Sequence, residues 1–234
     1  SRGRQHSPLV SRLSPHAVPS VQTRPFQQEF QQDGGEALVD VGLHEVDAVL
    51  VTHEHSDHIG GVSASARRFG WKVLLTHGTL AASRGADAGM SATVIDSHAA
   101  VSVGDLCVQP FPVPHDAREP VQFVVTDGAR RLGVLTDAGH VTPHMVAMLA
   151  SCDGLVLECN HDLRMLAQGS YPQSLKHRIG GLWGHLDNGA AASLLTQVRH
   201  SGLRHVVAAH LSEENNSADL ARGALSAALG CEPD

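Results

Sequence analysis

Residues 51–61, VTHEHSDHIGG, contain three histidines and an aspartate within six positions: His53, His55, Asp57 and His58. The segment directly follows the apolar run AVLV at 48–51. Because the spacing of the four side chains fits neither one face of a helix nor one face of a strand, packing does not explain it. We interpret the segment as a loop folded around a ligand, and clustered imidazole with a carboxylate is typical of a divalent metal site.

Three more potential ligands end apolar runs that the sequence predicts to be strands: His115 in FPVPH, Asp137 in GVLTD and His210 in VVAAH. Each alone is more often a capping or hydrogen-bonded residue. Ligands gather at the carboxyl ends of strands in layered α/β folds, however, and the motif at 53–58 requires distant ligands. We therefore predict two ions, one bound by His53, His55 and His115, the other by Asp57, His58 and His210, with Asp137 bridging both.

Nitrogen and carboxylate ligands without thiolate favour Zn²⁺, with Mn²⁺ or iron as alternatives. Two ions about 3.5 to 4 Å apart can share a water, lower its pKa towards neutrality and stabilise charge on the attacking and leaving oxygens. This chemistry is that of a hydrolase.

The elements that must position these residues alternate between strands and helices, which indicates an α/β domain over residues 33–234. Residues 1–32 contain four arginines and no acidic residue before Glu29, which predicts a disordered or poorly packed tail. Predicted strands cover 47–53, 71–76, 93–96, 106–113, 121–127, 131–137, 154–159 and 205–210, and predicted helices cover 34–42, 60–69, 142–151, 188–201 and 217–229.

Composition limits the function classes. The net charge of −7 means that nucleic-acid binding would depend on a local basic patch and bound cations. Five Phe, two Trp and one Tyr are too few for a single-strand-binding platform of stacked aromatics. The sequence contains no apolar run long enough to cross a bilayer, and its four sparse cysteines favour reduced, packed thiols. We expect a cytoplasmic protein without a membrane segment.

The HxHxDH motif after an apolar strand, followed by His, Asp and His at later strand ends, resembles the metallo-β-lactamase fold superfamily over about residues 40–230. Within it, VTHEHSDHIGG, FPVPHDAREPVQF, GVLTDAGHVT, LECNHDLRML, YPQSLKHRIGGLWGHLDN and AAHLSEENN are similar to the YycJ/WalJ branch. The resemblance implies an αββα sandwich with a dinuclear site at one edge, the same seven ligands, and nuclease activity on DNA 5′ ends. His58 after Asp57 disfavours a true zinc β-lactamase, and glyoxalase II enzymes have a C-terminal helical domain with no counterpart here.

The sequence departs from this branch at both ends. The branch has an early strand that ends in IDAG, whereas Asp40 lies only 13 positions before His53 and in a predicted helix. Residues 1–32 match no part of the branch, and a last strand would follow GCEPD. We therefore expect the first strands to be missing and the C-terminal end to be shortened.

Other residues are candidates for catalysis and substrate binding. We assign catalysis to Asp57 and Asp137 together with His185 and His161, which can protonate a leaving oxygen or hold a phosphate. The basic run Lys176, His177 and Arg178 can contact a phosphate backbone, although a solvated helix end explains it equally well. Two alternatives remain open, a hydrolase of a small ester, thioester or lactone, and an inactive metal-binding remnant.

Overall fold

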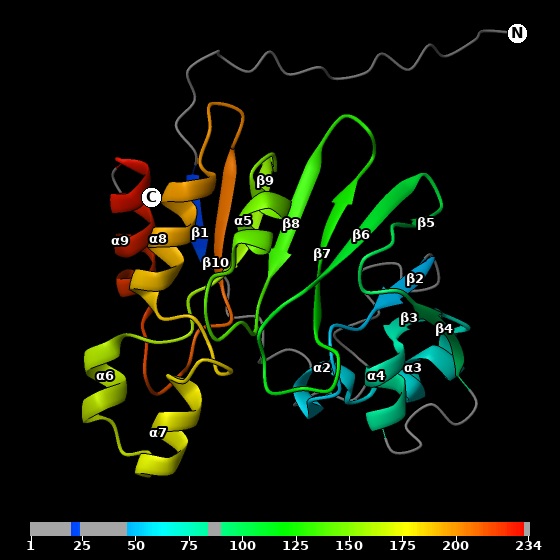
Figure 1. Cartoon of the computed structure of the whole chain (residues 1–234), viewed down its shortest axis with the longest axis horizontal. Coiled ribbons are helices and arrows are strands. Elements are labelled where there is room, and N and C mark those ends of the chain that lie inside the picture. The colour runs from blue at the N-terminus through cyan, green and yellow to red at the C-terminus, as the bar shows by residue number, and fades with distance from the viewer. Residues whose placement is uncertain (1–19, 24–45, 84–89, 232–234) are drawn as a thin grey trace, which may run out of the picture.

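Two facing β-sheets with helices on their outer faces form the fold (Figure 1). The computed structural model describes residues 20–23, 46–83 and 90–231. Helix, sheet, sheet and helix follow one another as layers, so the predicted αββα arrangement is confirmed. Within the described ranges, no helix is both long and apolar enough to cross a membrane.

The larger sheet has the order β1-β10-β9-β8-β7-β6-β5. The strands β8, β9, β10 and β1 are parallel, whereas β5, β6, β7 and β8 alternate in direction. The carboxyl ends of β6, β8, β9 and β10 therefore lie at one edge of the sheet. The bounds are β1 Ser20–Thr23, β5 Val101–Val103, β6 Leu106–Pro112, β7 Val121–Thr126, β8 Arg131–Leu135, β9 Gly154–Glu158 and β10 His205–Ala209.

The smaller sheet is fully parallel, with the order β2-β3-β4. Its strands are β2 Ala48–Leu50, β3 Lys72–Thr76 and β4 Ser91–Ile95, and the helices on its side are α2 Ser56–Ile59, α3 Val62–Phe69 and α4 His77–Ala82. The helices on the side of the larger sheet are α5 Pro143–Leu149, α6 Leu163–Gln168, α7 Gln173–Ile179, α8 Asn188–Val198 and α9 Ala218–Leu229.

Three hydrophobic clusters fill the spaces between these layers. Strand β3 shows why, because successive side chains of a strand point to opposite faces. Val73 and Leu75 pack with α3, whereas Leu74 between them packs with Phe123 of the larger sheet. The largest cluster lies between the larger sheet and α5, α8 and α9 and includes Leu157 of β9. Each layer is thus packed against its neighbour. This packing holds rigid the edge of the larger sheet at which β6, β8, β9 and β10 end.

Capping residues begin the helices that cover the larger sheet. Thr142 accepts from Met145 N at the start of α5, and Ser217 accepts from Leu220 N at the start of α9. Asp187 caps α8 through Gly189 N and Ala190 N, which satisfies backbone donors that a helix start leaves open. These caps define where α5, α8 and α9 begin.

Several predictions are corrected. Strand β1 lies inside the expected tail and pairs with β10, so the tail assignment is wrong for residues 20–23 and a strand does precede the motif. The expected loop at 53–58 contains the helical turn α2. Strand β5 and the short helices α4, α6 and α7 were not predicted. All four cysteines are free, but Cys107 is exposed, not packed. The predicted helix at 34–42, including Asp40, lies outside the described residues.

Candidate metal centre

The sequence motif and the later strand ends meet at the edge between the two sheets. His53 follows β2, and His115, Asp137 and His210 follow β6, β8 and β10. Asp137 and His210 both have a left-handed backbone, with φ of 52° and 56°. Residues other than glycine adopt this conformation rarely, and such local strain is common at functional sites. The backbone therefore turns sharply at two of the strand ends where the ligands are needed.

Among the residues that it describes, the structure brings together four overlapping sets of potential ligands, and two of these sets correspond to the predicted ion sites. In each set, one ligand atom per residue lies within 4.8 Å of the others. The first set is His53, His55 and His115, and the second is Asp57, His58 and His210. These are the same two sets that the sequence assigns to two ions, drawn from both sheets. The arrangement offers imidazole nitrogen and carboxylate oxygen, which suit Zn²⁺ and Mn²⁺.

Asp137 lies between the two sets. Its Oδ1 atom is 3.8 Å from His115 Nε2 in the first set and 3.4 Å from His210 Nε2 in the second. Its Oδ2 atom is 3.0 Å from His58 Nε2. With only 2% of its surface exposed, this carboxylate can contact ligand atoms of both sets at once. Asp137 thus has the position required of a bridging ligand.

Unpartnered nitrogens show that the cluster fits metal ions. His53 Nε2 and His210 Nε2 are buried and make no hydrogen bond within the described residues. A buried polar atom left without a partner is costly, so each needs a ligand to bind. Both nitrogens belong to the ligand sets described above. Bound cations would satisfy them.

Neighbouring groups fix which nitrogen faces the centre in three of the imidazoles. The Thr52 hydroxyl lies 3.0 Å from Nδ1 of both His53 and His58. His115 Nδ1 donates to the Gly184 carbonyl at 3.0 Å. When Nδ1 is bound in this way, Nε2 is the nitrogen directed at the other ligands, as is usual for metal-ligating histidines: His58 Nε2 lies 3.0 Å from Asp137 Oδ2 and His115 Nε2 lies 3.3 Å from His55 Nδ1.

Glu158 is the main functional residue that sequence reasoning missed. It is fully buried at the end of β9, and its Oε1 atom lies 2.9 Å from Nδ1 of both His210 and His185. Its Oε2 atom accepts from the backbone N–H groups of Ala138 and Leu186 at 3.0 Å. The available signal was an acidic residue closing the apolar run GLVLE at the same sheet edge. Glu158 orients two imidazoles and anchors the residues that follow Asp137 and His185.

Burial and charge set the protonation of the centre. Burial, with a contribution from His58, lowers the pKa of His53 to about 3, which leaves the neutral imidazole that a metal requires. Burial would also lower the pKa of His58, but hydrogen bonds and charge from Asp137 and Asp57 raise it to about 9. An ion that binds His58 must therefore displace a proton. Burial opposes ionisation of Glu158, yet hydrogen bonds from His185 and His210 lower its pKa to about 2.

The two histidines assigned to catalysis have different surroundings. His185 lies beside the cluster, with Nδ1 3.4 Å from Asp137 Oδ1 and a side chain that is 21% exposed. His161 is only 1% exposed and its Nδ1 lies 3.3 Å from Asn160 Oδ1. It belongs to none of the ligand groups among the described residues. Its Nε2 atom is buried and makes no hydrogen bond among the described residues, and the assignment of His161 to catalysis and substrate binding stays a prediction.

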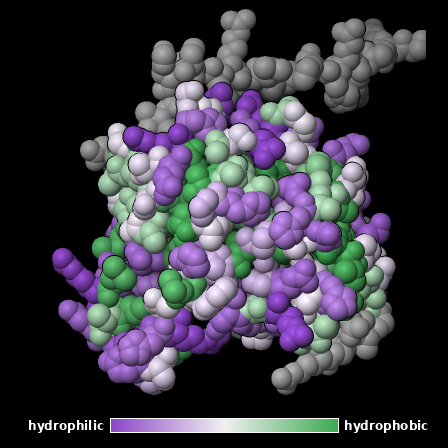
Figure 2. All heavy atoms as spheres, in the orientation of Figure 1, coloured by the Kyte–Doolittle hydropathy of each residue, from purple (hydrophilic) through white to green (hydrophobic). Residues whose placement is uncertain are grey.

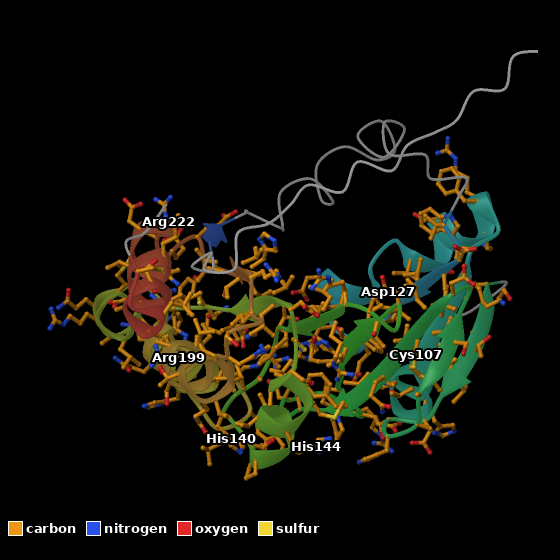
Figure 3. The ribbon with its side chains drawn as sticks, turned by 90° about the horizontal axis from the view of Figure 1, so that it is seen from above. Cys107, Asp127, His140, His144, Arg199 and Arg222 are labelled. Carbon is orange, nitrogen blue, oxygen red and sulfur yellow. The ribbon has the colours of Figure 1, made fainter. Side chains whose placement is uncertain are left out.

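The predicted substrate-binding cations also differ. Arg178 Nε donates to Asp116 Oδ2 at 2.6 Å, and Asp116 Oδ1 is 3.6 Å from His55 Nε2, so Arg178 lies at the rim of the cluster. Lys176 Nζ instead donates to the carbonyl of Ala167 in α6, which ties its charge to the α6–α7 corner. His140, on the α5 side of the molecule in Figure 3, donates from Nδ1 to the Leu182 carbonyl. Sequence reasoning did not identify Asp116.

We expect Gly184→Ala to weaken metal binding by roughly 10- to 100-fold, as loss of groups that orient metal ligands typically does. A Cβ at this position would lie 2.1 Å from Ile179 O and 2.2 Å from Arg178 O, so the backbone must move. The shift would carry the Gly184 carbonyl away from His115. Titration of the metal-free protein with Zn²⁺ measures the change.

The matched control is Gly223→Ala, on the exposed face of α9, where a new Cβ meets nothing within 4 Å. This change should leave metal affinity intact and raise the free energy of unfolding by about 0.5 to 1 kcal/mol, because alanine favours a helix interior more than glycine does. Equal metal affinities for both variants would contradict the role given to the Gly184 carbonyl.

Comparison with known proteins identifies the family. The model of the Beta-lactamase superfamily domain matches residues 17–211, a range that contains all seven predicted ligands. The chain belongs to the β-lactamase superfamily. The match begins before residue 33, where the sequence analysis places the start of the domain. Membership implies a hydrolase fold that binds divalent metal ions, and the histidine and carboxylate cluster supplies suitable ligands.

Relatives within the superfamily confirm the resemblance to its YycJ/WalJ branch. The chain is 35% identical to "Exodeoxyribonuclease YycJ" of Bacillus anthracis over 81% of its own length and 73% of the relative. It is 33% identical to "Exodeoxyribonuclease WalJ" of Streptococcus pneumoniae D39 over 76% and 68% of the two chains. The crystal structure of the metallo-β-lactamase fold protein YhfI of Bacillus subtilis matches with a TM-score of 0.66 at 15% identity, covering 85% of this chain and 77% of that one. That likeness concerns the fold alone.

Proposed function

We propose that the protein is a metal-dependent phosphodiesterase that degrades DNA from 5′ ends. The observation that carries the proposal is the 35% identity to an exodeoxyribonuclease over 81% of the chain. The convergence of two ligand sets around Asp137 supports it, because paired metal ions suit phosphodiester cleavage.

The chemistry of these residues supports a site for two ions, for which Zn²⁺ is our first choice and Mn²⁺ the alternative. One would be held by His53, His55 and His115, the other by Asp57, His58 and His210, with Asp137 shared between them. When bound, such ions supply charge that lowers the pKa of a water and offsets the charge developing on the phosphate.

Protein groups at the rim supply orientation and proton transfer. Because His185 Nδ1 is held by Glu158, its Nε2 is the nitrogen that can give a proton to a leaving oxygen. The Nε atom of Arg178 is held by Asp116, while the terminal nitrogens of its guanidinium group remain able to bind a phosphate oxygen. Arg178 thereby supplies a local positive charge on a chain whose net charge is −7.

The test is degradation of a 5′-phosphorylated duplex by the metal-loaded protein, compared with the same duplex blocked at both 5′ ends. We expect nucleotides to be released from the free 5′ ends and little release from the blocked duplex. Metal content is measured on the same preparation. Full activity on the blocked duplex would contradict the 5′-end specificity.

The acidic net charge of −7 favours a second candidate, hydrolysis of a small ester, thioester or lactone at the same cluster. Turnover of an acyl substrate without cleavage of any phosphodiester would decide for this candidate. Fewer than one ion per chain, with neither activity, would instead indicate an inactive remnant.

A further inference from the structure

A pair of large apolar side chains projects from the loop beside the metal centre. Leu182 and Trp183 are 68% and 60% exposed, and they directly precede Gly184, whose carbonyl binds His115. Scattered exposed apolar residues are common on soluble proteins and alone carry no meaning. This pair, however, directly precedes a group that orients a potential metal ligand, which places it beside the centre.

The backbone beneath the pair is firmly held. Three consecutive carbonyls accept hydrogen bonds from residues around the centre: Leu182 O from His140 Nδ1, Trp183 O from Asp116 N, and Gly184 O from His115 Nδ1. Gly139, in the loop after β8, lies so close that a Cβ there would be 2.3 Å from Leu182 C. A rigid backbone that presents an exposed indole loses little conformational freedom when a flat ligand stacks on that indole.

Basic residues close to the pair in sequence indicate which kind of ligand could bind there. The last turn of α7, just before the loop, contains Lys176, His177 and Arg178, and Arg178 reaches Asp116 beside the cluster. Helices α6 and α7 lie together at one corner of the molecule (Figure 1), where Figure 2 shows hydrophobic and hydrophilic residues side by side. An exposed aromatic residue in the loop that follows Arg178 matches a nucleotide, which has a flat base and an anionic phosphate.

We propose that Trp183, flanked by Leu182, is a stacking site for the terminal base of a DNA strand whose phosphates lie towards Arg178 and the metal centre. This inference rests on the proposed function and adds a binding contact for the base. One indole is a single stacking position, so it agrees with the scarcity of aromatic residues in the chain. A single stacking position can bind the base at the end of a DNA strand, but it cannot bind successive bases along a long single strand.

Fluorescence tests the contact independently of cleavage. The chain has two tryptophans, and Trp71 is buried in the core of the smaller sheet, so Trp71→Phe leaves Trp183 as the sole indole. We expect its emission to be quenched by a 5′-phosphorylated phosphorothioate oligonucleotide, which resists cleavage. An oligonucleotide of equal length and charge with an abasic 5′ terminus should quench much less. Equal quenching by the two would overturn the proposal.

Kinetics provide the second test. Trp183→Ala should raise the KM for an oligonucleotide roughly 10- to 100-fold, the range expected for loss of one stacked base, with a much smaller change in kcat. Trp183→Phe should recover most of the affinity, and Leu220→Ala, which truncates an apolar residue that is 44% exposed on α9, should have no effect. The variant Trp183→Ala should also no longer distinguish the normal strand from the abasic one.

The outcomes separate the two proposals. If the unaltered protein cleaves no DNA but turns over small esters, the proposed function fails. If it cleaves the normal and abasic strands with the same KM, and Trp183→Ala behaves like the unaltered protein, the stacking site alone is overturned. A change of oligomeric state in Trp183→Ala without a change in KM would make this surface a contact between copies and would also overturn the inference.

Discussion

Asp137→Asn is expected to reduce phosphodiesterase activity by roughly a thousandfold or more, because charge stabilisation of the transition state depends on both ions being in place. Asparagine keeps the size of the side chain and tolerates the left-handed φ of 52° found at this position, whereas alanine would add backbone strain. The amide lacks the negative charge that lies between His115 and His210. The activity loss should be accompanied by the loss of about one bound ion per chain.

Activity on DNA and metal content, measured on the same preparations, check this result. Asp105→Asn is the matched control. Asp105 is exposed in the turn between β5 and β6, so this substitution removes one negative charge far from the centre. A variant at Asp137 that keeps both ions and full activity would show that Asp137 does not bridge them.

Glu158→Gln is expected to destabilise the protein by about 3 kcal/mol or more, although the two side chains have nearly the same shape. Glu158 accepts from four N–H groups, two at each oxygen. Glutamine has one oxygen, so its NH₂ group would face two donors that remain buried and unpaired, each costing roughly 1 to 3 kcal/mol. Because His210 would lose its orienting partner, metal affinity should also fall roughly 10- to 100-fold.

Urea denaturation of the metal-free proteins and Zn²⁺ titration measure these two effects separately. Glu213→Gln, on the exposed surface after β10, is the control for the loss of one negative charge. If Glu158→Gln unfolded at the same urea concentration as Glu213→Gln, the four hydrogen bonds would contribute no net stability.

The candidate ligands could be predicted because their signal is local, and the structure brings these residues together. The HxHxDH spacing has no explanation in packing, and His115, Asp137 and His210 each end an apolar run. Glu158 gives a weaker signal, since one acidic residue after a strand is ordinary and its four partners come from separate segments. His161 shows another limit of such patterns, because a histidine after a strand gives no sign that only 1% of it will be exposed in the folded chain.

The fold was predictable to the extent that apolar periodicity extends over enough residues. The strands of the larger sheet from β6 to β10 and the helices α5, α8 and α9 have long or strongly apolar patterns, and they occur where predicted. Helices α6 and α7 have six and seven residues, fewer than two turns, so their periodicity is too short to recognise. Strand β1 is held by pairing with β10, a partner distant in sequence, and its short segment shows no such pattern on its own.

The location of the cluster has a mechanical consequence. The smaller sheet with α3 and the larger sheet with α5, α8 and α9 have separate hydrophobic clusters on their outer sides, and the ligands come from both. Ions bound across this boundary would add to the hydrophobic cluster between the sheets in holding the two halves together against local unfolding. Bound metal ions would then also slow amide hydrogen exchange along β2 and β3.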